Sequence, residues 1–226
     1  KLRLNIYEAE GHNDKLLPNL AKSSRLIFLL YFGYIFLGTI LYLICGMNFF
    51  DALNHSIAAL STGGFSTKVG NIYDFHSTSI ELVSMILMLL GGTNFVIHIL
   101  LLKRKFKSVI LHSETLFGFF LLISFVSVAV TIMSLTGFET DNNLFMVVSF
   151  QLISALTTTG FQNIADINIL PHFFIGMVII FMLIGGEMGS TAGGIKQYRI
   201  VTCFKGVNHY ISSSMRSSKI FHPSKI

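Results

Sequence analysis

The sequence predicts an all-helical membrane protein built from two tandem units, each a helix, a short pore helix, a filter-like loop and a second helix. The chain has 226 residues, of which 52% are hydrophobic and only 12% are charged, whereas soluble domains carry roughly 25% charged residues. A Thr/Gly-rich motif occurs twice. Runs without Asp, Glu, Lys or Arg, each near the ~20 residues of a spanning helix, cover residues 26–46, 82–102, 115–138 and 167–186.

The repeated motif is Leu60–Phe65, which an offset of 96 residues superposes on Leu156–Phe161. Both copies lie between apolar runs, and non-helical backbone at membrane depth is tolerated where it is buried in protein or lines a watery cavity. Backbone carbonyls in Thr/Gly-rich loops replace the water shell of potassium ions in selectivity filters. We therefore predict a cation filter, with K⁺ bound by Ser61, Thr62, Gly63, Gly64, Phe65, Thr157, Thr158, Thr159, Gly160 and Phe161.

The first unit follows a polar segment that contains Pro18. After the helix over 26–46, Asn48 caps a helix to about Ala59, which is too short to span and fits a re-entrant pore helix. A polar stretch then leads to a single returning helix over 80–102.

The second unit repeats this order after a short basic loop. It has an outward helix over 115–138, a pore helix over 142–156, a link over 166–171 and a returning helix from His172. Matched returning helices mark an internal repeat, which implies pseudo-symmetry around a shared axis. The predicted segments are a cytoplasmic lead-in (1–25), a pore repeat (26–102), a cytoplasmic loop (103–114), a second pore repeat (115–210) and a cytoplasmic tail (211–226).

The second returning helix is predicted to break at 185–195, because five glycines crowd into residues 185–194 and each costs a helix about 1 kcal/mol relative to Ala. Such a break would act as a hinge and gate; close packing through small residues is the alternative. An acid is costly in a membrane, so Glu187 should face a wet cavity or a partner. The predicted gating loop contains Gly185, Gly186, Glu187, Gly189, Ser190, Thr191, Gly193, Gly194 and Lys196.

Charge distribution predicts the orientation. Fifteen of the sixteen Lys and Arg residues lie in 1–25, 103–107 and from Lys196 onward, so these parts should be cytoplasmic. The opposite side should carry the acids Asp51, Asp74, Glu81, Glu139, Asp141 and Asp166. Of these, Asp74 and Asp166 are predicted to concentrate cations at an outer mouth, although the asymmetry could also serve topology alone. The same distribution argues against nucleic acid as the partner of a chain with net charge +5.

Other chemistries lack support in the sequence. The Gly-rich run has no P-loop pattern, and neither the eight histidines nor Cys45 and Cys203 have metal-ligand spacing. His98 is predicted to donate a hydrogen bond between helices rather than to bind metal. No nucleophile is paired with a base, so we expect no enzyme and no cofactor.

At these motifs the sequence resembles the Trk/Ktr/HKT superfamily of potassium transporters, in particular a TrkH-type membrane subunit. Residues 5–11 (NIYEAEG) resemble the lead-in to the family's second repeat, and residues 61–67 (STGGFST) and 157–161 (TTTGF) resemble its second and third filters. The most specific piece, IGGEMGSTAGGIK at 184–196, resembles the intramembrane loop beneath the filter.

The resemblance implies a four-repeat pore, of which this chain holds the second and third repeats, and therefore a fragment of a longer subunit. It also implies carbonyl ligands from Thr62–Phe65 and Thr158–Phe161, a homodimer of full-length subunits, a cytoplasmic TrkA/KtrA-like ring that binds NAD or adenine nucleotides, and symport as one possible coupling. The expected function is potassium uptake across the bacterial inner membrane. A non-conducting membrane scaffold or sensor is the alternative, and selectivity for potassium over sodium stays open.

Overall fold

The computed structural model describes residues 20–104, 113–138 and 143–214, and within these ranges the chain forms helices and loops but no strand. The predicted all-helical class is confirmed. Some predictions fall outside these ranges: the lead-in motif at 5–11, most of the basic 103–114 loop, the acids Glu139 and Asp141, and the tail from residue 215.

The first unit folds as a long helix, a short helix and a bent returning pair. Asn48 caps the short helix, because its side chain accepts a hydrogen bond from the Asp51 N–H; such caps satisfy the free amides at a helix start. The elements are α2 (Leu20–Ile44), α3 (Phe49–Leu60), the 3₁₀ turn η1 (Asn71–Phe75), α4 (Thr78–Gly92) and α5 (Phe95–Leu102).

The second unit repeats this order up to its returning helix. Asn143 caps the short helix through the Phe145 N–H, and Asp166 caps the following turn through the Asn168 N–H. The elements are α7 (Ser113–Leu135), α8 (Leu144–Leu156), η2 (Ile167–Ile169), α9 (His172–Ile184) and α10 (Gln197–Ser214).

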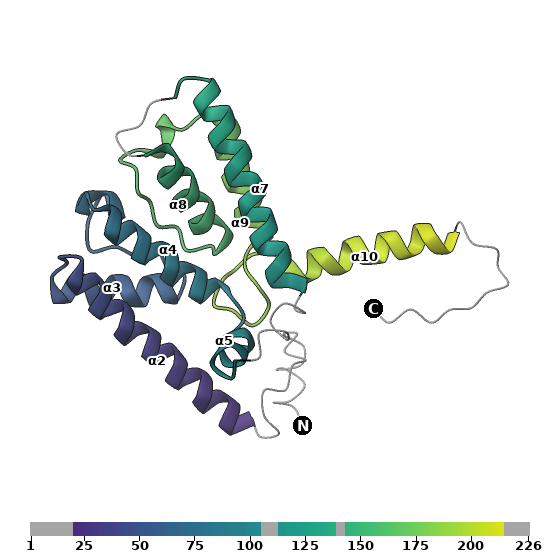
Figure 1. Cartoon of the computed structure of the whole chain (residues 1–226), viewed down its shortest axis with the longest axis horizontal. Helices are drawn as coiled ribbons and strands as arrows, with labels where there is room; N and C mark the ends of the chain where they lie inside the picture. The colour runs from purple at the N-terminus through teal and green to yellow at the C-terminus, as the bar shows by residue number, and fades with distance from the viewer. Residues whose placement is uncertain (1–19, 105–112, 139–142, 215–226) are drawn as a thin grey trace.

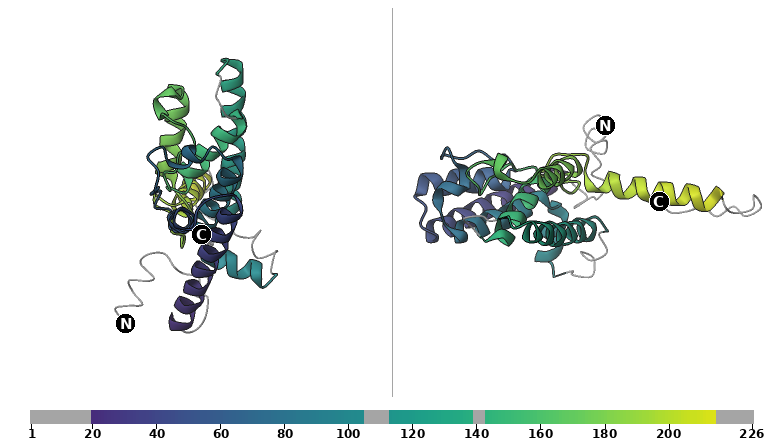
Figure 2. Two further views of the ribbon diagram at one scale, coloured as in Figure 1. Left: turned by 90° about the vertical axis from the view of Figure 1, so that its left-hand side faces the viewer. Right: turned by 90° about the horizontal axis from the view of Figure 1, so that it is seen from above.

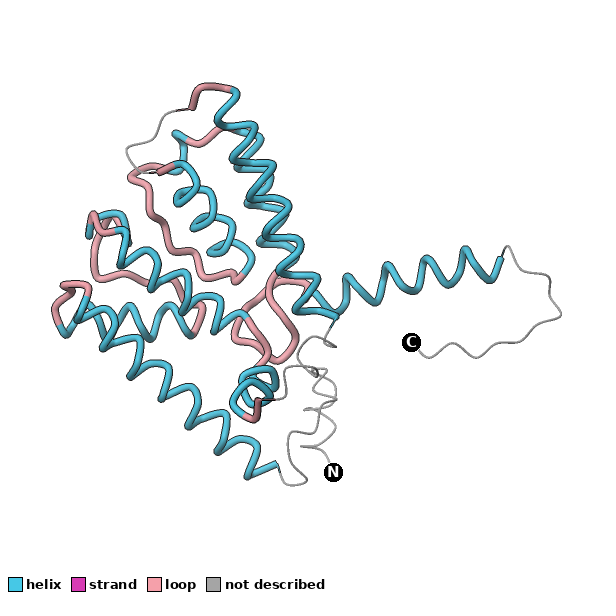
Figure 3. Tube along the Cα trace, in the orientation of Figure 1, coloured by secondary structure: helices cyan, strands magenta, loops and turns pink. Residues whose placement is uncertain are grey.

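Two helix clusters lie side by side (Figure 1). One contains α2, α3 and α4, and its core includes Tyr42, Leu87 and Met88; the other contains α7, α8 and α9, with Met133 and Phe174 in its core. The clusters are joined because Phe150 and Phe161 of the second unit pack into the first core. Long loops lie between them (Figure 3), and α10 extends away from both (Figure 2).

The predicted single helix over 80–102 is wrong. The chain leaves α4 at Gly92 and enters α5 at Phe95, and the two helix axes are bent by 104°. The corner is stabilised locally: the Asn94 side chain accepts from the Val96 N–H, and Nε2 of buried His98 lies 3.0 Å from the Leu90 carbonyl and 2.9 Å from the Thr93 hydroxyl. His98 thus bonds to the neighbouring helix, as predicted.

The predicted fourth spanning run is also shorter than expected. In the described part of the chain, Ser24–Ile44 and Leu116–Leu135 are long and apolar enough to span alone, and α4 with α5 would be a third span only as a bent pair. Helix α9 has 13 residues, about 20 Å at 1.5 Å per residue, against ~30 Å of hydrocarbon. It stops because Gly185 adopts φ +71°.

Two segment boundaries also differ from the helices. Helix α2 begins at Leu20, inside the predicted lead-in, and α10 runs through the predicted boundary at residue 210. In both places polar residues are helical: Lys22–Arg25 near the start of α2 and Ser212–Ser214 at the end of α10.

We expect Gly38→Val to destabilise the packing of α2. A Cβ at Gly38 would lie 2.5 Å from the Ser56 hydroxyl and 2.9 Å from a Leu87 methyl carbon, and overpacking of this kind costs about 1–3 kcal/mol. The matched control is Gly33→Val on the same helix, where no heavy atom lies within 4 Å. The melting temperature of the detergent-purified protein should fall for Gly38→Val and stay unchanged for Gly33→Val. Equal melting temperatures for the two variants would contradict the packing of α2 against α3 and α4.

Candidate functional site

The two Thr/Gly loops, Ser61–Phe65 and Thr157–Phe161, have the same backbone conformation. The caps Ser61 and Thr157 have φ/ψ of −75°/−2° and −79°/−3°. Thr62 and Thr158 follow with φ +53° and +54°, values that residues with a Cβ rarely adopt. The internal repeat therefore extends to strained single residues, which persist only where surrounding contacts hold them.

Each loop is bonded to the end of its own pore helix by equivalent hydrogen bonds. The amides of Thr62 and Gly63 donate to the carbonyls of Ala59 and Ala58. The amides of Thr158 and Thr159 donate to Ala155 and Ser154, which lie 96 residues later. These bonds satisfy carbonyls in the last turns of α3 and α8, so each loop is attached directly to the end of the short helix before it.

The two loops approach each other through their glycine segments. A Cβ on Gly64, which has φ +68°, would overlap the carbonyl oxygen of Thr159, whereas a Cβ on Gly160, at φ +88°, would meet no atom within 4 Å. Gly64 is therefore required both for its backbone conformation and for the close approach. The loops, 96 residues apart in sequence, lie against each other in space.

The aromatic residue differs between the loops. Phe65 is 81% exposed, while Phe161 is fully buried. The carbonyl of Phe161 accepts a hydrogen bond of 2.8 Å from the Ser154 hydroxyl, which also accepts from the Gly160 amide. The Phe161 carbonyl therefore points toward α8, and the ring serves packing.

The Gly-rich loop, Gly185–Lys196, joins α9 to α10. Its two ends are paired: the amides of Ile195 and Lys196 donate to the carbonyls of Leu183 and Ile184, and the Gln197 amide donates to Gly186. Gly185 and Gly194 pass so closely at this neck that a Cβ on either would overlap the other's backbone. The Lys196 ammonium closes the loop further by donating to the Ala192 carbonyl.

The tip of the Gly-rich loop contacts both Thr/Gly loops. The Thr191 hydroxyl oxygen lies 2.9 Å from the carbonyl oxygens of Leu60 and Gly91, and the Thr62 hydroxyl lies 2.9 Å from the Thr191 carbonyl. On the other side, the Gly193 amide donates to the Thr158 hydroxyl over 2.6 Å. One loop thus bridges equivalent threonines of both units.

Glu187 is buried, at 4% exposure, and bonds to the corner between α4 and α5. Its Oε2 accepts from the Asn94 amide over 3.0 Å, and its own amide donates to the Gly92 carbonyl. A carboxylate at a helix N-terminus is stabilised by the helix dipole. A cavity of about 20 Å³, which also borders Thr157 and Gln197, lies beside it and is about the size of one water. Glu187 therefore has the partner that a membrane acid requires.

The acids predicted on the outer side separate into two groups. Asp74 and Asp166 are exposed, and each accepts a hydrogen bond from a nearby backbone amide, that of Gly70 and that of Asn168. Asp51 and Glu81 are instead buried, at 5% and 4% exposure. These two form hydrogen-bonded networks behind the Thr/Gly loops, so they are not part of an open mouth.

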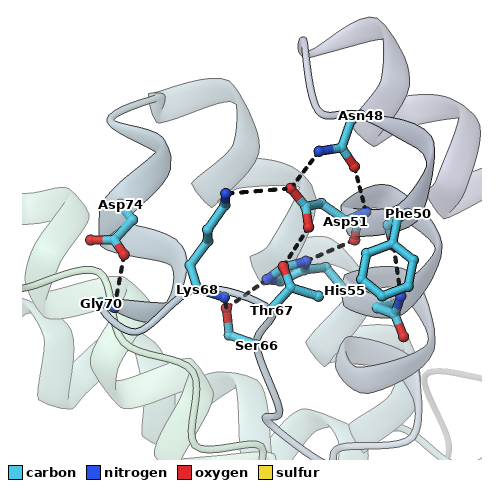
Figure 4. A network of polar contacts seen from close by, with 10 residues as sticks. Asn48, Phe50, Asp51, His55, Ser66, Thr67, Lys68, Gly70 and Asp74 are labelled. Carbon is cyan, nitrogen blue, oxygen red and sulfur yellow. Dashed lines mark hydrogen bonds and ion pairs between the residues drawn. The ribbon is translucent and has the colours of Figure 1, made fainter.

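The polar partners of the buried acids are not among the residues predicted from the sequence. In the first unit, His55 bonds to the Asp51 carbonyl and Thr67 to the Asp51 carboxylate (Figure 4). In the second unit, Gln151 donates to Asn163, and Asn163 donates to Glu81 of the first unit. The 96-residue offset, which pairs His55 with Gln151 and Thr67 with Asn163, could have identified them. Among the described residues, no group of three or more His, Cys, Asp or Glu side chains could hold a metal.

Comparisons with known proteins point to one family. The TrkH family, described as a cation transport protein, matches residues 2–224. The Trk system potassium uptake protein TrkH of Halomonas elongata is 29% identical over 95% of this chain and 43% of that protein. The Trk system potassium uptake protein TrkG of Escherichia coli is 32% identical over 88% of this chain and 41% of that protein.

A solved structure shares the fold. The crystal structure of the potassium transporter TrkH from Vibrio parahaemolyticus superposes with a TM-score of 0.81 at 23% identity, and covers 99% of this chain and 48% of that one. The chain spans less than half the length of the curated relatives it matches. Because the family match covers nearly all of its residues and the fold agrees, the chain is a membrane protein that belongs to the TrkH family of cation transport proteins.

Proposed function

We propose that this chain forms two of the pore-lining repeats of a potassium uptake protein. The observation that carries the proposal is the pair of Thr/Gly loops with one backbone conformation, packed against each other and bridged by the Gly-rich loop. Relatives over nearly the whole chain are named potassium uptake proteins. Two loops cannot surround an ion as four do, so the complete pore needs the remaining repeats of the full-length subunit.

In this proposal K⁺ is the transported ion, and no resident cofactor takes part. Exposed Asp74 and Asp166 raise the cation concentration at the outer entrance. The ion then exchanges its water for backbone carbonyls of Ser61–Gly64 and Thr157–Gly160, where two rigid loops hold the oxygens at a fixed separation. Phe65 and Phe161 flank this segment, Phe161 as a packing residue.

The Gly-rich loop is proposed as the gate. Its neck is held by backbone bonds at Gly185–Gln197, whereas its tip is attached to the pore through a few side-chain bonds, those of Thr62, Thr158 and Thr191. Opening would break these bonds while the neck stays closed. Ser190 stabilises the tip, because its hydroxyl donates to the Glu187 carbonyl over 2.6 Å.

The wider assembly follows the family. We propose a bacterial inner-membrane location with cytoplasmic termini, a homodimer of full-length subunits in lipid, and a cytoplasmic TrkA/KtrA-like nucleotide-binding ring. Helix α5 would carry signals from that ring, because it ends at basic Lys103 and Arg104 and begins at the Glu187 carboxylate. The same proposal includes symport, in which potassium uptake is coupled to the entry of H⁺ or Na⁺. The scaffold alternative is less favoured, since α9 is broken and the loops are adjacent.

Rubidium uptake by the full-length protein in cells that lack potassium uptake tests this function. We expect uptake that excess potassium blocks and that excess sodium leaves unchanged, because both loops are built for a carbonyl filter. Uptake that sodium blocks equally would reject potassium selectivity. No uptake, from protein that reaches the membrane together with its regulatory subunits, would favour the scaffold.

Gly64→Ala should reduce selectivity more than Gly160→Ala. Both positions have positive φ, which costs a residue with a Cβ about 1–2 kcal/mol, but only a Cβ at Gly64 would also overlap the Thr159 carbonyl. The measurement is rubidium uptake with and without competing sodium. A larger selectivity loss for Gly160→Ala would contradict the packing of the two loops.

Glu187→Ala should increase basal rubidium flux without the regulatory ring. The substitution removes a charge-assisted hydrogen bond worth about 1.5–3 kcal/mol, so the closed-to-open ratio of the Gly-rich loop should fall by about tenfold or more. Glu187→Gln, which keeps an acceptor for the Asn94 amide, is the matched control and should give an intermediate flux. Unchanged flux from an equal amount of Glu187→Ala protein would show that this contact does not restrain the gate.

A further inference from the structure

A polar network follows the first Thr/Gly loop in the chain (Figure 4). Its members Asp51 and His55 are buried, whereas Thr67 and Lys68 are exposed. Asp51, in the first turn of α3, accepts hydrogen bonds from the Thr67 hydroxyl and the Asn48 side-chain amide, and the Lys68 ammonium lies 3.9 Å from it. One turn later, His55 Nδ1 lies 2.7 Å from the Asp51 carbonyl, and its Nε2 lies 2.8 Å from the Ser66 hydroxyl. The network therefore joins the pore helix to the chain immediately after the loop.

His55 also connects the two units. The residue is fully buried, and its ring centroid lies 5.2 Å from that of Phe75 and 5.8 Å from that of Phe161. Phe161 is the last residue of the second Thr/Gly loop. We call the segment by which the chain leaves each loop its outer limb, Phe65–Lys68 in the first unit and Phe161–Asn163 in the second. His55 thus contacts both outer limbs, that of the first loop through a hydrogen bond to Ser66 and that of the second through its ring against Phe161.

A second network lies behind the second Thr/Gly loop. Gln151 of α8 donates its amide to Asn163 Oδ1 over 3.2 Å, and Asn163 donates its own amide to Glu81 Oε2 over 3.1 Å. All three side chains are at most 4% exposed. Glu81 belongs to α4 of the first unit, so this network crosses between the units. The Tyr73 amide makes a parallel crossing to the Gln162 carbonyl.

The two networks occupy equivalent positions but have different chemistry. The 96-residue offset pairs His55 with Gln151 and Thr67 with Asn163, while Asp51 corresponds to apolar Val147. The second unit therefore lacks a carboxylate on its own pore helix, and Glu81 of the first unit supplies one. The chain that follows the first loop thus bonds to the buried carboxylate of Asp51, and the chain that follows the second loop bonds to that of Glu81.

These contacts complete the attachment of the loops. The inner end of each loop is bonded to its pore helix and to the Gly-rich loop, and the networks hold the outer limb. Loss of one partner would leave a buried polar group unsatisfied, and this penalty favours a single arrangement. A limb held in one arrangement also holds the carbonyls between its two attachments.

We propose that Asp51–His55–Thr67 and Glu81–Asn163–Gln151 are positioning residues that determine ion specificity by holding the outer limbs of the two filter loops. This inference rests on the proposed potassium uptake function. None of these side chains touches the ion; they act through the backbone of Gly63–Phe65 and Thr159–Phe161. Release of either limb should let the carbonyls adapt to sodium, so selectivity should fall while transport continues.

The test uses the full-length protein with the near-isosteric variants Thr67→Val and Asn163→Leu, each of which removes the hydrogen bond to one carboxylate. Matched controls are Thr136→Val and Asn54→Leu, whose side chains bond to the backbone carbonyls four residues earlier, those of Ile132 and Phe50. Thr67→Ser, which retains the hydroxyl, is the rescue variant. Rubidium uptake is measured against increasing sodium, and melting of the purified protein is measured in potassium and in sodium.

We expect the sodium concentration that halves rubidium uptake to fall about tenfold in Thr67→Val and Asn163→Leu, since a hydrogen bond to a charged group has that effect on an equilibrium. The extra stability conferred by potassium over sodium should shrink in parallel. The controls and Thr67→Ser should match the parent protein. If Thr67→Val or Asn163→Leu abolishes uptake, the difference between the melting temperatures in potassium and in sodium tests the proposal for that variant.

Parental sodium sensitivity and a parental melting difference in both variants would overturn the proposal. So would an equal decrease in the controls, because the effect would then be general destabilisation. Failure of the proposed function gives a different result: the parent protein itself would take up no rubidium and would melt at the same temperature in potassium and sodium.

Discussion

The Thr191 hydroxyl, which lies 2.9 Å from the carbonyl oxygens of Leu60 and Gly91, holds three parts of this protein together. Loop backbone at membrane depth needs hydrogen-bond partners from the protein itself, since lipid offers none. The Gly-rich loop supplies these partners to the pore helix and to the returning helix. Helix α4 comes this close because Gly91 has no side chain, and a Cβ there would overlap the Leu60 carbonyl.

This shared requirement explains why the two units keep one backbone while their side chains diverge. Thr62 and Thr158 have the same left-handed conformation and both bind the Gly-rich loop. Around them, the first unit uses Asp51 and His55, and the second uses Gln151 and a carboxylate from its neighbour. Backbone geometry is thus the common element, and each unit satisfies it with different side chains.

The Gly-rich loop also contacts the bent helix pair of the first unit. Glu187 joins this loop to the start of α5, and Lys103 caps the other end of α5. Because the same carboxylate bonds to the corner between α4 and α5, the position of α5 and the position of the loop are linked by one buried contact. The fold therefore contains a direct link between α5 and the Gly-rich loop, which contacts both Thr/Gly loops.

The sequence by itself determined the helical class, the repeat, the helix cap Asn48 and the glycines at which α9 ends, because these depend on hydrophobic runs and local backbone preferences. Only the tertiary structure decided which acids are exposed, since Asp51 and Asp74 look alike in sequence but differ in burial. It also decided the α4–α5 bend, where Glu187 of the other unit accepts a hydrogen bond from the Asn94 amide, and the Glu81–Asn163 contact across 82 residues. Long-range contacts of this kind depend on how helices pack, and no local pattern encodes them.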